Sequence, residues 1–118
     1  MKLALFSADD DVARVTVSGK ITQRELITTH DTLLDLLGPN AYTKTVVMDL
    51  GEAEYIDSSG IGWLLGCHKR FRHQGGKLVL HSLRPVVSNV VRVLKLDTVF
   101  ELASNQQAAL LSAEGKTA

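Results

Sequence analysis

The sequence predicts a small α/β domain in which helices flank a mixed β-sheet. The chain starts with two strand-like segments separated by three aspartates, which is typical of an antiparallel hairpin. Strand-like and helix-like segments then alternate, and strand–helix–strand units favour parallel pairing with a right-handed crossover. The predicted order is therefore β-β-α-β-α-β-α-(β)-α, with helices packed on one mixed sheet.

Length and charge narrow the class of protein. The chain has 118 residues, the size of one domain, and we expect residues 113–118 to fray. Lys and Arg number 13, as do Asp and Glu, so the formal net charge is +0. This balance argues against nucleic acid as the main ligand and against a polybasic membrane anchor. No apolar run approaches the ~18 residues of a membrane span, so we expect a cytoplasmic protein.

The hairpin is predicted over residues 3–8 and 12–18. Apolar and polar residues alternate in the second segment, which places three apolar side chains on one buried face: Ala13, Val15 and Val17. The aspartates at 9–11 are typical of a turn. Their adjacent spacing does not match a calcium loop, in which acidic ligands alternate along the chain.

A capping box predicts the start of the first helix. Thr22 is the expected N-cap, Glu25 reaches back to it, and Gly38-Pro39 ends the helix. The apolar stripe of this helix is Leu26, Ile27, Leu33, Leu34 and Leu37. His30 lies on the stripe, and we expect it to pack there rather than to bind a ligand.

The remaining elements follow from the same signals. First come a strand buried on both faces at 45–50, a loop at 51–56, and a helix at 58–73 that ends at Gly75-Gly76. A strand at 77–81 follows, and then a helix from Ser82 to Leu96, with Ser82 as its cap and Pro85 in its first turn. The chain closes with a short edge strand at 99–101 and a helix through Leu111, which starts at a capping box at 104–107.

The most informative segment opens the helix that follows the loop. Asp57 or Ser58 can cap this helix by accepting from its first N–H groups. A glycine inside a helix costs about 1 kcal/mol relative to alanine, so Gly62 and Gly66 are not explained by capping. Gly60 falls in the first turn, where the cost is smaller. On a helical wheel Gly62 and Gly66 point away from the core, which predicts a bare outer face.

The same wheel sorts the other side chains of this helix. The expected core side consists of Ile61, Leu64, Leu65, His68 and Phe71. Arg72 also falls on that side, where it can extend to water. Trp63 points away from the core, and two interpretations stay open: it folds over a core edge, or it anchors an interface.

A hydroxyl at a helix start beside a bare face suits a switch by charge. A phosphate on Ser58 adds about −1.5 to −2 charges. The helix dipole tolerates that charge, so the fold survives. A partner covering the bare face would meet the phosphate close to Asp57, and binding would be lost without unfolding.

Catalytic and metal chemistry have weak support. Ile56 stands where a nucleophile elbow needs glycine, and the helix glycines are spaced one residue too widely for G-x-G-x-x-G. His68 and His73 are five residues apart on different faces, so they form no helical metal pair. The single cysteine, Cys67, excludes an intrachain disulfide framework. The basic run at 69–73 lies at a helix C-terminus, where cations stabilise the dipole, and it predicts a solvated face rather than a phosphate patch. We expect no enzyme, no cofactor and no metal.

Several segments resemble the STAS family, the domain shared by sulphate transporters and bacterial anti-sigma factor antagonists. The resemblance rests on residues 46–50, 56–62 and 75–78, with support from 90–94 and 96–100. It implies a STAS-like fold and a stand-alone antagonist. In its unphosphorylated form such a protein binds an anti-sigma factor, which is often itself a serine kinase, and thereby frees the sigma factor.

The resemblance also implies the site. The kinase phosphorylates Ser58, with Ser59 as second choice, a serine phosphatase reverses this, and ATP belongs to the partner. The partner-binding residues are expected to be Asp57, Ser59, Gly60, Gly62, Trp63 and Gly66. Lys20 and Thr22 stand where the family often carries acidic residues, so partner contacts there can differ.

Two alternatives remain. A STAS scaffold subunit of a stressosome-like or lipid-transport complex would use the same helix face without phosphorylation. A small nucleotide-binding protein or enzyme would use residues 57–62 as an anion site at a helix start.

Overall fold

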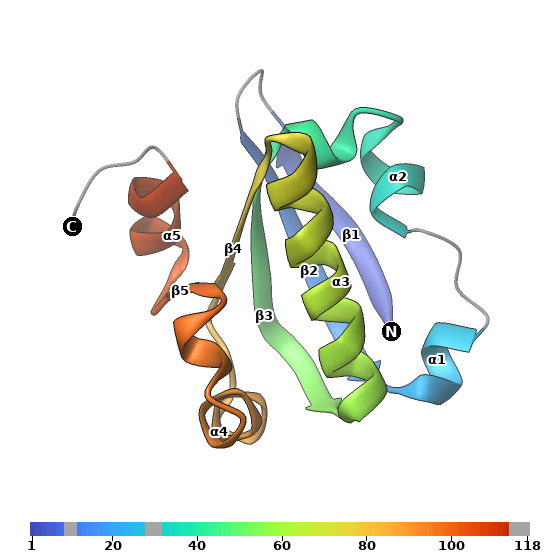
Figure 1. Ribbon diagram of the computed structural model, residues 1–118, viewed down its shortest axis with the longest axis vertical. Coiled ribbons are helices and arrows are strands. Elements are labelled where there is room, and N and C mark those ends of the chain that lie inside the picture. The colour runs from blue at the N-terminus through green and yellow to red at the C-terminus, as the bar shows by residue number, and fades with distance from the viewer. Residues whose placement is uncertain (9–11, 28–31, 114–118) are drawn as a thin grey trace.

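The computed structural model describes residues 1–8, 12–27 and 32–113, and within these ranges it shows one five-stranded sheet (Figure 1). In sheet order the strands are β1 (Lys2–Ala8), β2 (Val12–Ile21), β3 (Thr45–Ile56), β4 (Lys77–His81) and β5 (Glu101–Ala103). β1 is antiparallel to β2, and the other neighbours are parallel. The predicted mixed α/β fold is confirmed. The predicted turn at 9–11 and most of the predicted frayed end lie outside the described residues.

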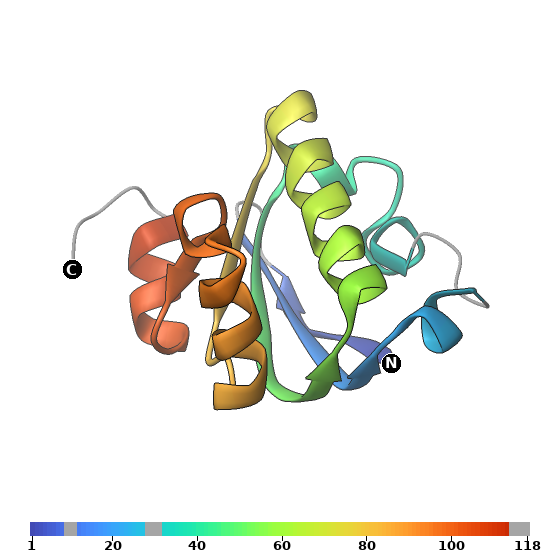
Figure 2. The same cartoon turned by 60° about the horizontal axis from the view of Figure 1, so that its bottom comes forward.

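Helices cover both faces of this sheet. They are α1 (Gln23–Ile27), α2 (Thr32–Leu37), α3 (Ser58–Gln74), α4 (Pro85–Val93) and α5 (Gln106–Ala113), with short 3-10 turns η1 (Ala41–Thr43) and η2 (Leu96–Thr98). In Figure 2, α3 lies on one side of β4 and α5 on the other. The alternating side chains of β2, Ala13, Val15 and Val17, are buried together as predicted.

The main core lies between one sheet face and the helices α2, α3 and α4. These helices contribute Leu33, Ile61, Leu64, Phe71, Val87 and Val91. A smaller cluster of Val47, Val79 and Ala109 packs on the opposite face, where α5 lies. β3 is thus buried on both faces near its start, which agrees with its nearly continuous apolar sequence.

The predicted loop at 51–56 is wrong, because β3 continues to Ile56. β4 pairs with β3 only as far as Asp49, whereas β2 pairs with β3 to its end, with Ile21 beside Ile56. Exposed Glu52 and Glu54 made this segment look like a loop. Because β3 extends past the point where its pairing with β4 ends, α3 starts directly after the projecting end of β3.

The predicted helix at 22–37 is present as two short helices, α1 and α2. The carbonyl of Thr22 accepts hydrogen bonds from the amides of Glu25 and Leu26, so α1 starts where the capping box predicts. Glu25 Oε2 lies 3.2 Å from the Met1 amino group. His30 lies outside the described residues.

Ser82 is not the cap of α4. Its φ of +61° places it in the left-handed region, and its Oγ lies 2.8 Å from Nδ1 of the buried His81. Arg84 occupies the N-cap position, directly before Pro85. α4 ends at Val93, before the predicted end at Leu96, because the chain turns into η2.

The C-terminal elements are shifted by one or two residues. The edge strand starts at Glu101, two residues later than predicted, because Phe100 turns into the core. Asn105 caps α5: its Oδ1 accepts from the amide of Ala108 at 2.9 Å, so the capping box predicted from Ser104 is wrong. α5 runs to Ala113 rather than Leu111.

Candidate functional site

Asp57 joins the start of α3 to the start of α1. Its Oδ1 accepts from the Gly60 amide at 2.9 Å, and its Oδ2 accepts from the Gln23 amide at 3.0 Å. Gln23 is the first residue of α1, so one carboxylate serves two helix starts. The Asp57 amide donates to the carbonyl of Ile21 at 3.2 Å, which attaches this corner to the end of β2.

These amide donors hold the pKa of Asp57 below its ordinary value. The Gln23 N–H is the largest cause, and the Gly60 N–H is the next. Desolvation acts in the opposite direction, with a smaller effect than either of these two amides. The side chain is therefore an anion at neutral pH, and the two amides favour that form over the protonated one.

Asp57→Asn should destabilise the protein at neutral pH. An asparagine side chain has one acceptor oxygen, so one of the two amides faces an NH₂ group instead. Because the pKa of Asp57 is lowered on folding, its contribution is complete above 3.8 and is lost as the pH falls through the lower folded pKa. Urea unfolding from neutral to acidic pH should show the two proteins converging in acid. Parallel pH profiles would contradict this role.

Gly60 is buried and serves packing at the same corner. A Cβ at this position would overlap the carbonyl oxygen of Ile21 and would lie 2.6 Å from Ile56 Cγ1. The end of β2 can approach α3 this closely because residue 60 has no side chain. The absence of a side chain at Gly60 thus serves internal packing, and its contact with a partner stays a prediction.

The outer face of α3 is bare, as predicted. Ser58, Gly62 and Gly66 follow one another at i, i+4 and i+8, so they share one face of the helix. Among the described residues, apart from the nearby backbone of α3 itself, nothing would lie within 4 Å of a Cβ added at Gly62 or Gly66. We call this surface, made by Ser58, Gly62 and Gly66, the glycine strip. Neither glycine packs on the strands.

The two serines differ in exposure. Ser58, the first residue of α3, is exposed, and its hydroxyl makes no hydrogen bond to any other residue that the structure describes. Ser59 is half-buried. The Ser58 hydroxyl is thus accessible at the end of the glycine strip. Trp63 is half-buried and packs against the main core, which favours the first interpretation of that residue.

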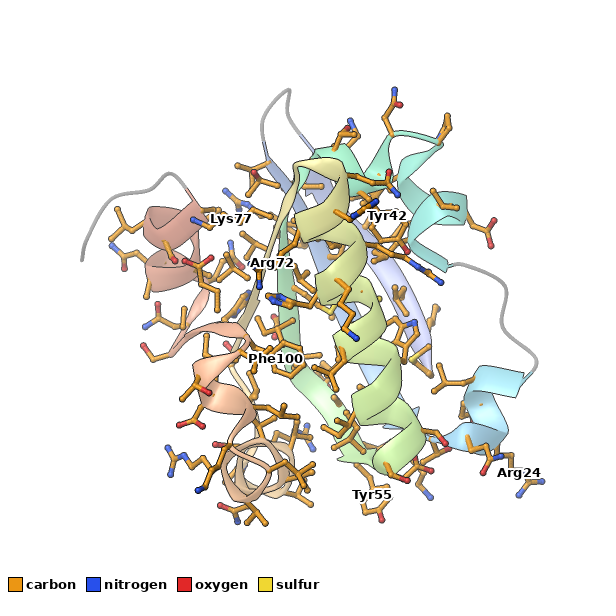
Figure 3. All side chains as sticks on the ribbon, viewed as in Figure 1. Arg24, Tyr42, Tyr55, Arg72, Lys77 and Phe100 are labelled. Atoms are coloured by element: carbon orange, nitrogen blue, oxygen red, sulfur yellow. The ribbon has the colours of Figure 1, made fainter. Side chains whose placement is uncertain are left out.

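Two neighbours of this corner cannot be recognised from the sequence. Gln23 is predicted at a helix start, with no link to Asp57. Tyr55 falls in the predicted loop at 51–56, but it lies on β3, 47% exposed, opposite Lys20 of β2. In Figure 3, Tyr55 lies at the base of α3, the end that carries Ser58. The exposed Lys20 and the half-buried Thr22 also belong to this end of the sheet.

The burial of the remaining α3 side chains agrees with most of the helical-wheel prediction. Ile61, Leu64, Cys67 and Phe71 are buried, and Arg72 is exposed. Within the described ranges, no three His, Cys, Asp or Glu side chains gather as metal ligands. No helix in the described part of the chain is long and apolar enough to cross a bilayer.

Comparison with known proteins gives the family. A family model described as "Mlab, STAS domain" matches residues 4–112. The chain belongs to the STAS domain family. This STAS domain is 37% identical over 66 residues to a candidate anti-sigma factor antagonist, BtrV, of Bordetella bronchiseptica. The alignment covers 56% of this chain and 57% of BtrV, so it spans little more than half of that relative.

Solved structures show the same fold. A candidate anti-sigma factor antagonist of Thermotoga maritima superposes on this STAS domain with a TM-score of 0.80 and 20% identity, covering 92% of each chain. The unphosphorylated form of the anti-sigma factor antagonist SpoIIAA from Bacillus gives a TM-score of 0.68 and 14% identity, covering 97% of this chain and 98% of SpoIIAA. A phosphorylated form of SpoIIAA is also known.

Proposed function

We propose that this STAS domain is an anti-sigma factor antagonist whose binding is switched off by phosphorylation of Ser58. The observation that carries the proposal is the exposed Ser58 hydroxyl at the end of a helix face with open space at Gly62 and Gly66. The name of the relative BtrV and the phosphorylated form of SpoIIAA support it. The site is a docking surface with a modifiable group at its edge and needs no cofactor of its own.

The glycine strip allows another protein to approach the backbone of α3 closely. Side chains normally keep two helices 8–10 Å apart, and glycines shorten that distance. The anti-sigma factor would lie along the strip, with Ser59 and the exposed part of Trp63 at its border. Lys20 and Tyr55 would lie near the same end, so the partner of this protein would meet a lysine there.

Phosphorylation changes the charge of this surface without breaking the fold. The phosphate would lie at the N-terminus of α3, where the dipole and free amides favour an anion. It would also lie one residue from the ionised Asp57, and Glu54 is exposed on the preceding strand. A partner that docks against the neutral strip would face a bulky dianion and neighbouring carboxylates, and the complex would dissociate.

The reaction partners follow from this chemistry. The anti-sigma factor is proposed to be a serine kinase that brings ATP, and a serine phosphatase would restore the hydroxyl. These components place the exchange in the cytoplasm. Incubation with the kinase and ATP, followed by intact-mass and fragment analysis, should show one phosphate on Ser58 and none on Ser58→Ala. Binding without any phosphorylation would instead indicate a scaffold subunit.

Ser58→Asp should weaken anti-sigma factor binding more than tenfold, about 1.4 kcal/mol, and leave the urea unfolding midpoint unchanged. The added carboxylate mimics part of the phosphate charge. Ser104→Asp is the control, since Ser104 is also exposed and precedes a helix, far along the chain from the strip. Calorimetry measures binding. Unfolding of Ser58→Asp, or binding equal to that of Ser104→Asp, would contradict the switch.

A further inference from the structure

A groove lies at the C-terminal half of α3, the half that does not carry Ser58. It runs between α3 and the segment from Val99 to Glu101, and two adjoining hollows of about 680 Å³ and 410 Å³ form it. Both hollows are lined by His68, Arg72 and Val99. We call it the α3–β5 groove. In Figure 3, Arg72 and Phe100 lie in the space between α3 and the C-terminal elements.

The groove carries more positive than negative charge. Its cationic lining consists of Lys69, Arg70, Arg72 and Lys77, whereas Glu101 is the acidic residue in the lining. Lys77 Nζ lies 3.5 Å from Glu101 Oε2, so that carboxylate already has a counter-ion. Arg72 and Lys69 form no ion pair with any residue that the structure describes. Two cationic side chains are thus left without an anion.

The helix dipole accounts for only part of this arrangement. Cations in a last helical turn stabilise the helix, which explains why basic residues gather here. That effect does not require a hollow, however, and Arg72 lines both parts of this one. The sequence predicts a solvated basic face, and the structure shows basic side chains around a hollow that also has apolar walls at Leu65 and Val99.

His68 is a second sign of a binding site. Its ring meets Phe100 edge-on, with centroids 5.7 Å apart, and its Nε2 is buried with no hydrogen-bond partner among the described residues. Buried polar atoms in native proteins are nearly always paired, and an exception calls for an explanation. A ligand that enters the groove and shifts the ring slightly would supply a partner.

We propose that the α3–β5 groove binds a small organic anion that carries a phosphate group on an apolar body. The Arg72 guanidinium matches a phosphate with two parallel N–H donors, and Lys69 adds the second positive charge that a dianion requires. Leu65 and Val99 contact the apolar body. Each hollow has the size of a small-molecule site. This site is distinct from the glycine strip and from the capped start of α3.

Phenyl phosphate is a direct probe, because it joins an aromatic ring to a phosphate. Titration followed by amide NMR should give saturable shifts at residues 65–73 and 99–101, at millimolar concentration. Inorganic phosphate lacks the apolar body and should bind at least fivefold more weakly. Phenol lacks the charge and should cause no saturable shift at Arg72.

Arg72→Gln should weaken phenyl phosphate binding at least fivefold. The matched control is Arg24→Gln, which removes the same charge from an exposed residue of α1 at the far edge of the molecule (Figure 3). Lys69→Gln tests the second cation if Arg72→Gln alters the fold. Absence of saturable shifts at 65–73, equal affinity for inorganic phosphate, or equal losses in Arg72→Gln and Arg24→Gln would each overturn the proposal.

Discussion

Gly60→Ala is expected to lower the free energy of unfolding by about 3 kcal/mol, a large effect for one added methyl group. The methyl would overlap the backbone oxygen of Ile21 and would lie only 2.6 Å from Ile56 Cγ1. Backbone cannot move aside as a flexible side chain does. Relief requires α3 to move away from β2, and that movement would strain the Asp57 hydrogen bonds to Gln23 and Gly60.

Urea unfolding followed by circular dichroism measures this effect, and Gly62→Ala is the matched control. It makes the same chemical change on the same helix, but the new methyl meets open space. Alanine favours the helix more than glycine, so Gly62→Ala should raise the unfolding free energy by about 0.5–1 kcal/mol. Equal changes of the same sign in both variants would show that residue 60 is not tightly enclosed.

Gly62→Leu is expected to weaken anti-sigma factor binding more than tenfold, or about 1.4 kcal/mol, while the protein stays as stable as wild type or becomes more stable. The leucine side chain would project from the glycine strip, where the described residues outside α3's own nearby backbone leave 4 Å of open space around the added Cβ. It would therefore occupy space that the proposed partner needs. Stability and binding change in opposite directions, which separates this effect from misfolding.

Gln107→Leu is the control for added surface hydrophobicity, since Gln107 is exposed on α5, away from α3. Its binding should equal that of wild type in the same calorimetric assay. If Gly62→Leu also binds like wild type, then the partner does not dock on the strip. If both variants lose affinity equally, the loss arises from the added surface hydrophobicity and not from the position of residue 62 on the glycine strip.

Local patterns predicted the elements whose signals lie within their own residues. Alternation in β2 predicted the buried face, and the glycine after Gln74, which has a φ of +88°, ended α3 close to the expected position. The bare face of α3 was also predictable, because helix geometry alone determines which residues share a face. These features depend on neighbours a few positions away.

The features that were missed depend on segments far apart in the chain. Residues 51–56 form a strand because β2 supplies their pairing partners, and their own polar composition concealed this. The packing role of Gly60 depends on the close approach of Ile21, which the local sequence does not reveal. The link between Gln23 and Asp57 likewise depends on the folded chain bringing Asp57 to the start of α1. Ser82 was misassigned because a serine before a helix is usually a cap, whereas this one is next to the buried His81.

The carboxylate of Asp57 has a further consequence for how the protein responds to its surroundings. Since the Gln23 and Gly60 amides share this acceptor, the first turns of α1 and α3 are mechanically coupled. A protein that displaces α1 on binding would strain the Asp57 hydrogen bonds beside Ser58. A change in conformation at Ser58 would in turn affect the start of α1. Under the proposed function, the effect of binding would thus extend to α1, a segment that lies apart from the Ser58 hydroxyl in the sequence.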